Sequence, residues 1–367
     1  MEGYSMSFTK PTISKPKIAP GWIYCIRDED YLDQSISRYV KLGLTERTVE
    51  ERIQEHQTGN PRREYEAIDS KYLELMHYAE TYLHHAFAPD RIAGEWFDMD
   101  DARLTAEVGT LLDDLETEMQ EHAPFVQRWY ALNDVLDNDL SRPPAGDEPQ
   151  WAADFKDAYE RMTVAKAIVD THKNNLLREL GTAQSINRVM YIGQSTNSPT
   201  FNKTAFEALV TPAQLAQCET TTTRTSRTLE MLDKGDDLDT LNPTVKAAFD
   251  ASEVGLSRPS ATNMSGVEVA LSQAIQDEHM ALLRAMKDVK EAEWDCIKAQ
   301  VKLIDALGDN LEIRGIIRWK RKEITETKFD SKRAKELFEA EYNAAKRPPT
   351  NPFTYKTEYH YMRKYNP

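Results

Sequence analysis

The sequence predicts an α+β protein with a small three-stranded sheet and helices at the N-terminus, a mainly α-helical region with a long helical hairpin or coiled coil, and a small C-terminal α+β module. Three observations support this prediction. Short aromatic and β-branched segments alternate between positions 21 and 97. Apolar residues recur every seven positions from 275 to 303, and strand-like segments return after 311. A length of 367 residues is typical of two or three domains.

The bulk composition excludes several classes of protein. Charged residues make up 29% of the chain, the mean hydropathy is -0.64, and no apolar run approaches the roughly 20 residues that span a bilayer. The N-terminus lacks the apolar centre of a signal peptide. The cysteines, three in number and far apart, predict neither a disulfide framework nor a zinc site. We therefore expect a cytoplasmic protein that does not enter a membrane.

The charge is negative overall but unevenly distributed. A net charge of -15 argues against a protein that coats nucleic acid with its whole surface. Residues 294–364, however, hold 16 Lys and Arg against 11 Asp and Glu. Any contact with nucleic acid is therefore expected to be local, to involve a metal ion, or to use the C-terminal end.

The N-terminal part is predicted to be a flexible tail at 1–19, rich in Ser, Thr, Lys and Pro, followed by a first domain at 20–100. Alternation and helical spacing predict its elements: strands at 21–27, 38–44 and 64–69, helices at about 48–57 and 72–87, and a short extended piece at 94–97. Thr48 and Glu51 have the spacing of a capping box, and Thr58-Gly59-Asn60-Pro61 is expected to end the first helix.

The rest of the chain is predicted as four segments: a helical connector at 101–140, a linker at 141–150, a helical region at 151–310 with an irregular Thr/Ser-rich insert at 195–265, and a basic C-terminal module at 311–367. The longest periodic element, 266–307, is a heptad repeat of Ile275, Leu282, Val289, Cys296 and Leu303, with alanines at the second seam position. This pattern suits close helix packing, either against 151–180 in an antiparallel hairpin or against a second copy in a homodimer.

Five polar residues of the first domain have the chemistry for cutting a phosphodiester: Tyr24, Lys41, Arg52, His56 and Glu80. The reaction needs a base for water and a cation for the charge on phosphate, and a divalent metal ion can supply much of both. Tyr24 and Lys41 can face each other across a hairpin and handle a proton. Arg52 and His56 share a helix face, where Arg52 can clamp a phosphate. Glu80 can hold Mg²⁺ or Mn²⁺. Taken singly, each residue is as typical of an ordinary strand or a solvated helix face.

The motifs from Gly21 to Phe97 resemble the GIY-YIG endonuclease superfamily, and more closely a phage-centred branch of it. They are Gly21-Trp22-Ile23-Tyr24, Lys41-Leu42-Gly43-Leu44-Thr45, the Arg52 helix ending at Thr58–Pro61, Glu80 with His84, and Gly94-Glu95-Trp96-Phe97. The resemblance implies a metal-dependent DNA endonuclease. It makes Tyr24 a general base or water positioner, Arg52 the phosphate contact, His56 a proton-transfer residue and Glu80 the metal ligand. It also implies structural roles for Gly43, His84, Glu95 and Trp96.

This chain departs from the superfamily pattern in two places. Lys41 stands where the second motif has a tyrosine, with Tyr39 one strand period earlier, and the loop at 28–38 is longer and more acidic than usual. A second match to that motif, Tyr191-Ile192-Gly193-Gln194-Ser195, follows a predicted long helix and precedes no arginine helix. We interpret it as a coincidence or a degenerate copy.

The C-terminal end, from Leu303 to Tyr365, is similar to the tail of YqaJ-type phage recombination exonucleases. This resemblance implies an accessory module without exonuclease activity. Its basic residues, which would form a hairpin that contacts DNA, are Arg314, Arg318, Lys320, Arg321 and Lys322. Trp319 would be available for stacking on a base. The alternative is a solvated hairpin surface.

The leading hypothesis is a phage-type DNA endonuclease that uses Mg²⁺ or Mn²⁺. Two alternatives stay open. One is a DNA-binding protein that keeps the fold but has lost catalysis at Lys41. The other is a phage protein that binds another protein through its 275–303 helix.

Overall fold

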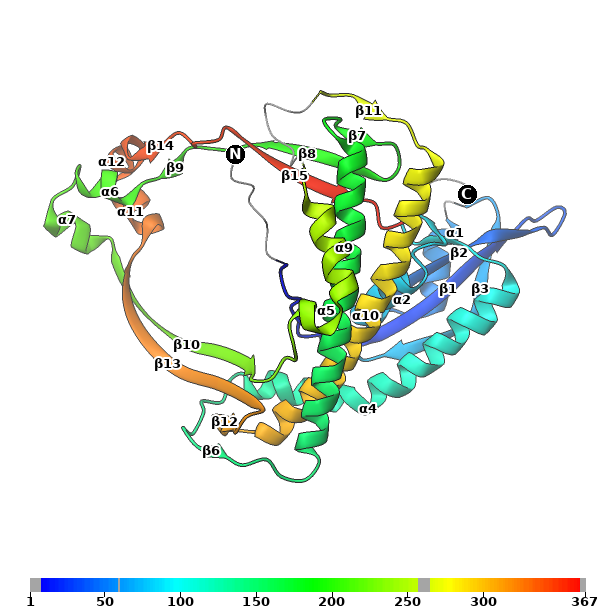
Figure 1. Cartoon of the computed structure of the whole chain (residues 1–367), viewed down its shortest axis with the longest axis horizontal. Helices are drawn as coiled ribbons and strands as arrows, with labels where there is room; N and C mark the ends of the chain where they lie inside the picture. The colour runs from blue at the N-terminus through cyan, green and yellow to red at the C-terminus, as the bar shows by residue number, and fades with distance from the viewer. Residues whose placement is uncertain (1–7, 59, 257–264, 364–367) are drawn as a thin grey trace.

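The computed structural model describes residues 8–58, 60–256 and 265–363, and it confirms the α+β class. The first domain contains a five-stranded sheet in the order β3-β1-β2-β5-β4, with two helices (Figure 1). The strands are β1 Gly21–Glu29, β2 Ile36–Thr45, β3 Arg63–Leu73, β4 Arg91–Ala93 and β5 Trp96–Asp98. The helices are α1 Val49–Gln57 and α2 Met76–Ala86.

Three predictions for this domain need correction or qualification. The sheet has five strands and not three, because β4 and β5 add to the free edge of β2. The second helix begins at Met76 and not at Tyr72, since Tyr72 pairs with Trp22 in the sheet. At the first helix, the side chain of Thr48 accepts a hydrogen bond from the backbone N–H of Glu51 at 3.3 Å, which is one half of the predicted capping box. Among the described residues, the reciprocal bond from the Thr48 N–H to the Glu51 side chain is not found. Gly59, part of the expected helix stop, lies outside the described residues.

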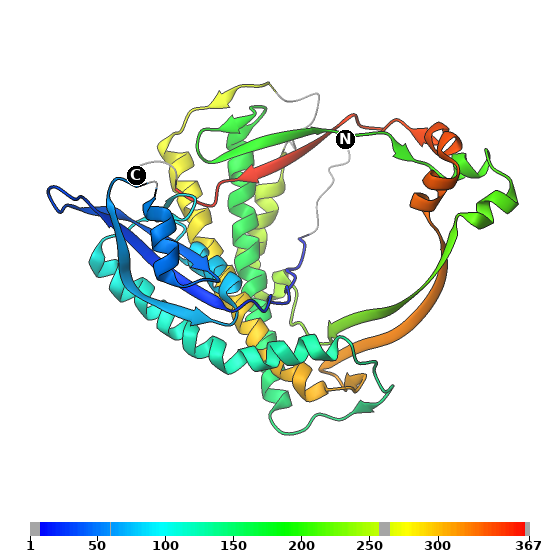
Figure 2. The ribbon, with the colours of Figure 1, turned by 180° about the vertical axis from the view of Figure 1, so that it is seen from behind.

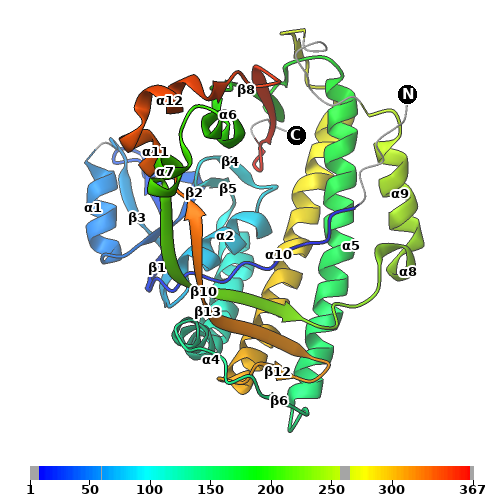
Figure 3. The same cartoon turned by 90° about the vertical axis from the view of Figure 1, so that its left-hand side faces the viewer.

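The N-terminal segment from residue 8 to residue 19, predicted as part of a flexible tail, packs against the helices. Residues 1–7 lie outside the described residues. The carbonyl of Pro11 accepts a hydrogen bond from the Tyr159 hydroxyl at 2.8 Å. Lys15 Nζ lies 3.3 Å from the centroid of the Tyr130 ring. The segment crosses the two long helices in Figure 3 and bridges to Leu75 at Ala19.

The connector consists of α3 Asp101–Arg103, η1 Leu104–Gly109 and α4 Thr110–Leu132. The expected linker at 141–150 is structured. It contains β6 Ser141–Arg142, which pairs in parallel with β12 Glu312–Ile313. Arg142 also pairs with Glu148 at 2.5 Å, at the start of the next helix. Charge pairing and a strand ladder therefore order a segment whose prolines and glycine predict a loop.

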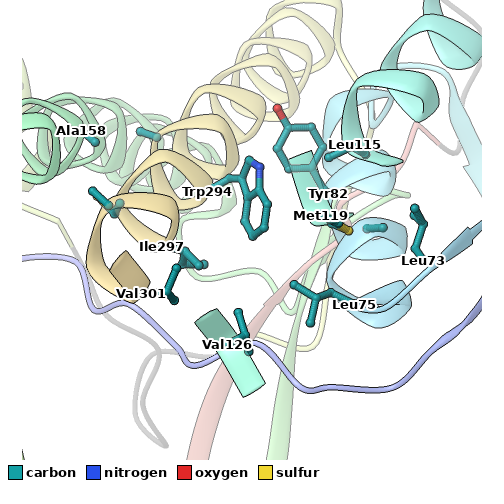
Figure 4. Packing of buried hydrophobic residues seen from close by; sticks show 14 of the residues in the cluster. Leu73, Leu75, Tyr82, Leu115, Met119, Val126, Ala158, Trp294, Ile297 and Val301 are labelled. Atoms are coloured by element: carbon teal, nitrogen blue, oxygen red, sulfur yellow. The ribbon is translucent and has the colours of Figure 1, made fainter. Parts of the chain in front are cut away.

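The two longest helices, α5 Glu148–Leu180 and α10 Gln273–Leu307, lie side by side in opposite directions (Figures 1 and 3). This is the intramolecular hairpin that the heptad pattern allows. Ile275, Leu282, Cys296 and Leu303 are buried, and alanines at the second seam position let the two backbones approach closely. A main apolar core joins this hairpin to the first domain. Figure 4 shows residues of that core, including Leu73, Leu75, Tyr82, Leu115, Met119, Val126, Trp294, Ile297 and Val301.

The Thr/Ser-rich segment at 195–265 was predicted to be irregular, but its centre has regular secondary structure. Its centre is β10 Glu219–Met231, which pairs along its whole length with β13 Ile317–Phe329 in an antiparallel ribbon. Threonine is β-branched and favours strands, and Thr221 and Thr327 share a hydrogen bond across the ribbon at 2.7 Å. The flanking elements are β7 Ser185–Ile186, β8 Met190–Thr196, β9 Thr200–Phe201, α6 Lys203–Glu207, α7 Pro212–Gln217, α8 Leu238–Leu241, α9 Pro243–Glu253 and β11 Glu268–Val269.

The C-terminal region does not form a module of its own. It contains α11 Ser331–Leu337, α12 Glu339–Ala344, β14 Lys346–Arg347 and β15 Phe353–Tyr359. β15 pairs with β8, and β14 pairs with β9, so both strands lie in sheets with the preceding segment. Within the described ranges, no helix is long and apolar enough to cross a membrane.

Candidate functional site

One face of the N-terminal sheet gathers the candidate residues. β1 and β2 pair so that Tyr24 lies opposite Gly43 and Ile26 lies opposite Lys41. Directly paired residues of antiparallel strands point to the same face, so Tyr24 and Lys41 share it. Helix α1 covers this face, where Val49 packs in a small apolar cluster with Tyr24 and Ile26. β5 extends the face by placing Trp96 opposite Lys41.

Tyr24 and Arg52 form the first contact of the site. Arg52 Nε on α1 donates a hydrogen bond to the Tyr24 hydroxyl at 3.3 Å. Tyr24 is 0% exposed, and burial raises its pKa, although Arg52 opposes the rise. The phenol is therefore neutral at physiological pH and has no surface on which to meet a water. The hydroxyl accepts from the guanidinium and so orients it, and the role of Tyr24 as a general base or water positioner stays a prediction.

Gly43 is required by the packing of Tyr24. A Cβ at this position would lie 2.6 Å from the Tyr24 hydroxyl and 3.1 Å from Glu95 Oε2. Real Cβ atoms do not tolerate the first distance, so only glycine lets β2 pass across the Tyr24 ring.

Lys41 links α1 to the GEWF segment. Its side chain is largely buried, and Nζ lies 2.9 Å from His56 Nε2 and 3.3 Å from Glu95 Oε2. Burial, and then the positive charges of Lys41 and Arg52, lower the pKa of His56. A neutral His56 thus accepts the hydrogen bond from Lys41 at Nε2 and carries its own proton on Nδ1.

Glu80, on α2, is the candidate metal ligand. Burial and the neighbouring charge of Glu95 raise its pKa to about 7, while Arg91 and Lys41 oppose the rise. Among the described residues, no hydrogen bond or ion pair to Glu80 is found. A half-buried carboxylate beside a second carboxylate is relieved by a hard divalent cation, which prefers oxygen ligands. The residues present therefore fit Mg²⁺ or Mn²⁺, with water and phosphate oxygens completing the coordination.

In this arrangement the protein supplies two carboxylates to the metal ion, those of Glu80 and Glu95. Within the described part of the chain, no cluster of three or more His, Cys, Asp or Glu side chains could hold a metal ion by itself. Glu95 was expected to be structural, but its carboxylate faces the site and contacts Lys41. The resemblance assigned the whole GEWF motif to the scaffold, so this residue was missed. No signal in the sequence indicated the direction of this carboxylate.

His84 and Trp96 have different surroundings. His84 Nε2 lies 3.1 Å from the carbonyl of Leu42, and its ring packs on Phe97 with centroids 5.5 Å apart. Burial lowers the pKa of His84 to about 4, so it is neutral and donates to that carbonyl. These contacts fix β2 against α2. Trp96, by contrast, is partly exposed on the same face as Lys41.

The predicted basic hairpin is far from a uniform cationic surface. Arg321 is 0% exposed and donates to the carbonyls of Leu132, Gly308 and Asn310, while its guanidinium stacks on Trp319. Arg321 and the buried Trp319 therefore support the base of the ribbon and cannot meet DNA. Arg314 donates to the carbonyl of Ser141, Arg318 pairs with Glu312, and Lys322 pairs with Asp139. Lys320 is exposed.

The second motif match at Tyr191–Ser195 lies in β8, away from the sheet of the first domain. A Cβ at Gly193 would meet nothing closer than 3.7 Å, in contrast to Gly43. Comparisons of the chain with models of protein families, with characterised proteins and with solved structures find no match. The functional proposal therefore depends on the geometry of the site.

Proposed function

We propose that the protein hydrolyses phosphodiester bonds of DNA with a divalent metal ion, at the site formed by Arg52, Lys41, His56, Glu80 and Glu95. The observation that carries the proposal is the convergence of Arg52 and Lys41, on the sheet face that α1 covers, with Glu80 of α2, whose raised pKa responds to the charges of Glu95 and Lys41. Phosphoryl transfer builds negative charge on the phosphate oxygens, which cationic side chains stabilise, and a carboxylate can hold the metal ion that does the same.

The chain's own residues have separate roles in this proposal. Arg52, oriented by Tyr24, binds a nonbridging phosphate oxygen and stabilises its developing charge. The neutral His56 has its one lone pair on Nε2, where it accepts from Lys41. For His56 to take up the proton that the attacking water releases, Lys41 Nζ must first leave Nε2, and Glu95 Oε2, 3.3 Å away, is the partner that would keep it. Glu80 and Glu95 would hold the metal ion. When bound, that ion lowers the pKa of water and polarises the phosphate.

The test is cleavage of an internally labelled linear duplex in Mg²⁺, in Mn²⁺ and in EDTA. We expect cutting only with metal, and its loss in Glu80→Ala. Glu50→Ala, an exposed carboxylate on α1, is the matched control and is expected to cut normally. DNA binding without cutting would support the alternative of a protein that has lost catalysis. Neither binding nor cutting would favour a protein partner.

A further inference from the structure

Residues 141–231 and 268–359 repeat one arrangement of elements. The first copy contains β6, the long helix α5, β7, the outgoing strand β8, the short helices α6 and α7, and the returning strand β10. The second copy contains, in the same order, β11, α10, β12, the outgoing strand β13, α11, α12 and the returning strand β15. The long helices end at Gly181 and Gly308, with φ of 58° and 60°. After them, Ile192 N–H donates to Gln184 at 2.8 Å, and Trp319 N–H donates to Leu311 at 2.8 Å. The second member of each pair lies 127 residues after the first, so the second YIG-like motif corresponds to the start of β13.

The two copies exchange their strands. β8 leads outward from the first copy and pairs with β15 of the second, while β13 leads outward from the second and pairs with β10 of the first. The short strands are exchanged too, β6 with β12 and β11 with β7. Each connection therefore leaves one end of the helical hairpin and returns to the other end, after passing through the distal lobe of α6, α7, α11 and α12 (Figure 2).

The result is a closed frame, which we define as residues 190–231 and 317–359 together with α5 and α10. In Figures 1 and 2 the two ribbons leave opposite ends of the hairpin and meet in the distal lobe. Measured along the chain, the 13 residues of β10 are about 43 Å long and the 33 residues of α5 about 50 Å. A DNA duplex must pass with its whole diameter, which is smaller than either length. Because the main chain of each copy is continuous through the distal lobe, that lobe has no seam at which the frame could open.

One face of the β10–β13 ribbon carries a row of basic side chains. The register places Ser226 opposite Lys322 and Thr228 opposite Lys320, on the face opposite to that of Trp319. Most of these side chains have acidic partners: Arg224 and Lys328 pair with Glu326, Arg318 with Glu312, and Lys322 with Asp139. Lys320 is exposed and has no ion pair among the described residues. Most of the ribbon is exposed on both faces, and such two-stranded ribbons are marginally stable alone in water. A two-stranded ribbon with basic and hydroxyl side chains suits phosphates and fits a major groove.

The positive charge of the frame lies in its two connections and not in its helices. Residues 190–231 and 317–359 hold 14 Lys and Arg against 10 Asp and Glu, α5 and α10 together hold 10 against 13, and the whole chain has a net charge of -15. The acidic surface elsewhere repels a polyanion, and the connections are the part of the frame that attracts one. A closed frame gives no advantage in binding an acidic globular protein, whereas it would retain a long polyanion such as duplex DNA.

We propose that the frame encloses duplex DNA, which enters by a free end, with the basic face of the β10–β13 ribbon contacting its phosphates. The substrate of the N-terminal site is then linear duplex DNA and not a closed circle. The inference depends on the proposed function for one point, the choice of DNA as the enclosed polymer.

Retention on DNA tests enclosure, with the full chain carrying Glu80→Ala, in EDTA. Protein is loaded at low salt on a linear duplex attached to a bead at one end, the free end is then blocked with streptavidin, and the bead is washed with high salt. We expect retention on the blocked duplex, release after a restriction cut, and no retention on a closed circle or a duplex blocked before loading. Equal retention on closed circles, or none on duplex blocked after loading, would overturn the proposal.

Paired charge reversals test the contact surface. Lys320→Glu with Lys328→Glu changes the ribbon face, and Lys246→Glu with Lys287→Glu makes the same charge change on α9 and α10. We expect the ribbon pair to weaken duplex binding at least about tenfold and to reduce the salt dependence by about two phosphate contacts, against less than about twofold for the control. Equal effects in both pairs, with thermal unfolding unchanged, would remove the ribbon from the proposal.

The two proposals fail separately. Retention on end-blocked DNA without cutting in Mg²⁺ would refute the nuclease and support the frame. Metal-dependent cutting of closed circles without retention would support the nuclease and refute the frame.

Discussion

Glu80→Gln is the most informative single substitution, because it separates a metal ligand from a structural carboxylate. Glutamine has the same shape but no charge and no titration. In the folded protein, burial and Glu95 raise the pKa of Glu80 from 4.5 to about 7. The unfolded chain therefore loses this proton at lower pH than the folded chain does, and stability falls as pH rises from about 4.5 towards 7. Above pH 7 the loss is complete.

The size of the effect follows from the shift. One pKa unit corresponds to about 1.4 kcal/mol, but Glu80 is only half-buried, so solvent screening reduces the total to about 1–2 kcal/mol. In EDTA at pH 8, Glu80→Gln should therefore be more stable than the wild type by about 1–2 kcal/mol. At pH 4.5 the difference should nearly vanish, since the wild-type carboxyl is then mostly protonated in the folded state.

Denaturant unfolding at the two pH values, with EDTA or Mg²⁺, measures these differences. Mg²⁺ at about a hundred times its Kd should stabilise the wild type by about 2.7 kcal/mol at pH 8 and leave the variant unchanged. Destabilisation of the variant at pH 8 in EDTA, or equal stabilisation of both proteins by Mg²⁺, would refute the reasoning.

Three further predictions concern packing and charge. Gly43→Ala should lower the free energy of unfolding by about 1–3 kcal/mol and reduce cleavage, because the added Cβ would overlap the buried Tyr24 ring. Gly193→Ala should leave the free energy of unfolding unchanged or raise it slightly. Similar losses in both variants would contradict these contact distances. Arg52→Ala should lower kcat/KM by about 10²–10³, and Arg52→Lys should recover little of it because a two-pronged contact is lost; full recovery would indicate a simple charge effect. Arg321→Met should destabilise by about 2–4 kcal/mol through unpaired carbonyls, with Lys320→Met within about 0.5 kcal/mol, as measured by urea unfolding.

Local signals predicted the elements that local contacts decide. Thr48 caps its helix as the pattern indicates, and the heptad at 275–303 packs in a hairpin within the chain. The candidate site also brings together residues named from the sequence, such as Lys41 and His56. Hydrophobic periodicity and capping are properties of neighbouring residues, and a single sequence is enough to show them.

Long-range pairing decided what the sequence could not show. The threonines of β10 suggest a loop until their partners, about 100 residues away in β13, are known. The repeat was missed because its copies share few identical residues, such as Leu180-Gly181 and Leu307-Gly308, while hydrogen-bond geometry carries the likeness. Glu95 was placed in the scaffold because a motif does not show which way its carboxylate points.

Joining two copies in one chain removes a constraint that identical subunits obey. In a symmetric dimer, every substitution appears on both arms, but here the two ribbons have diverged. The β8–β15 ribbon carries one lysine and one glutamate, whereas the β10–β13 ribbon carries seven basic and four acidic residues. A rod held between a neutral side and a cationic side has two inequivalent orientations. The fusion thus gives a pseudo-symmetric scaffold a polarity, and the single N-terminal domain always faces the same end of it.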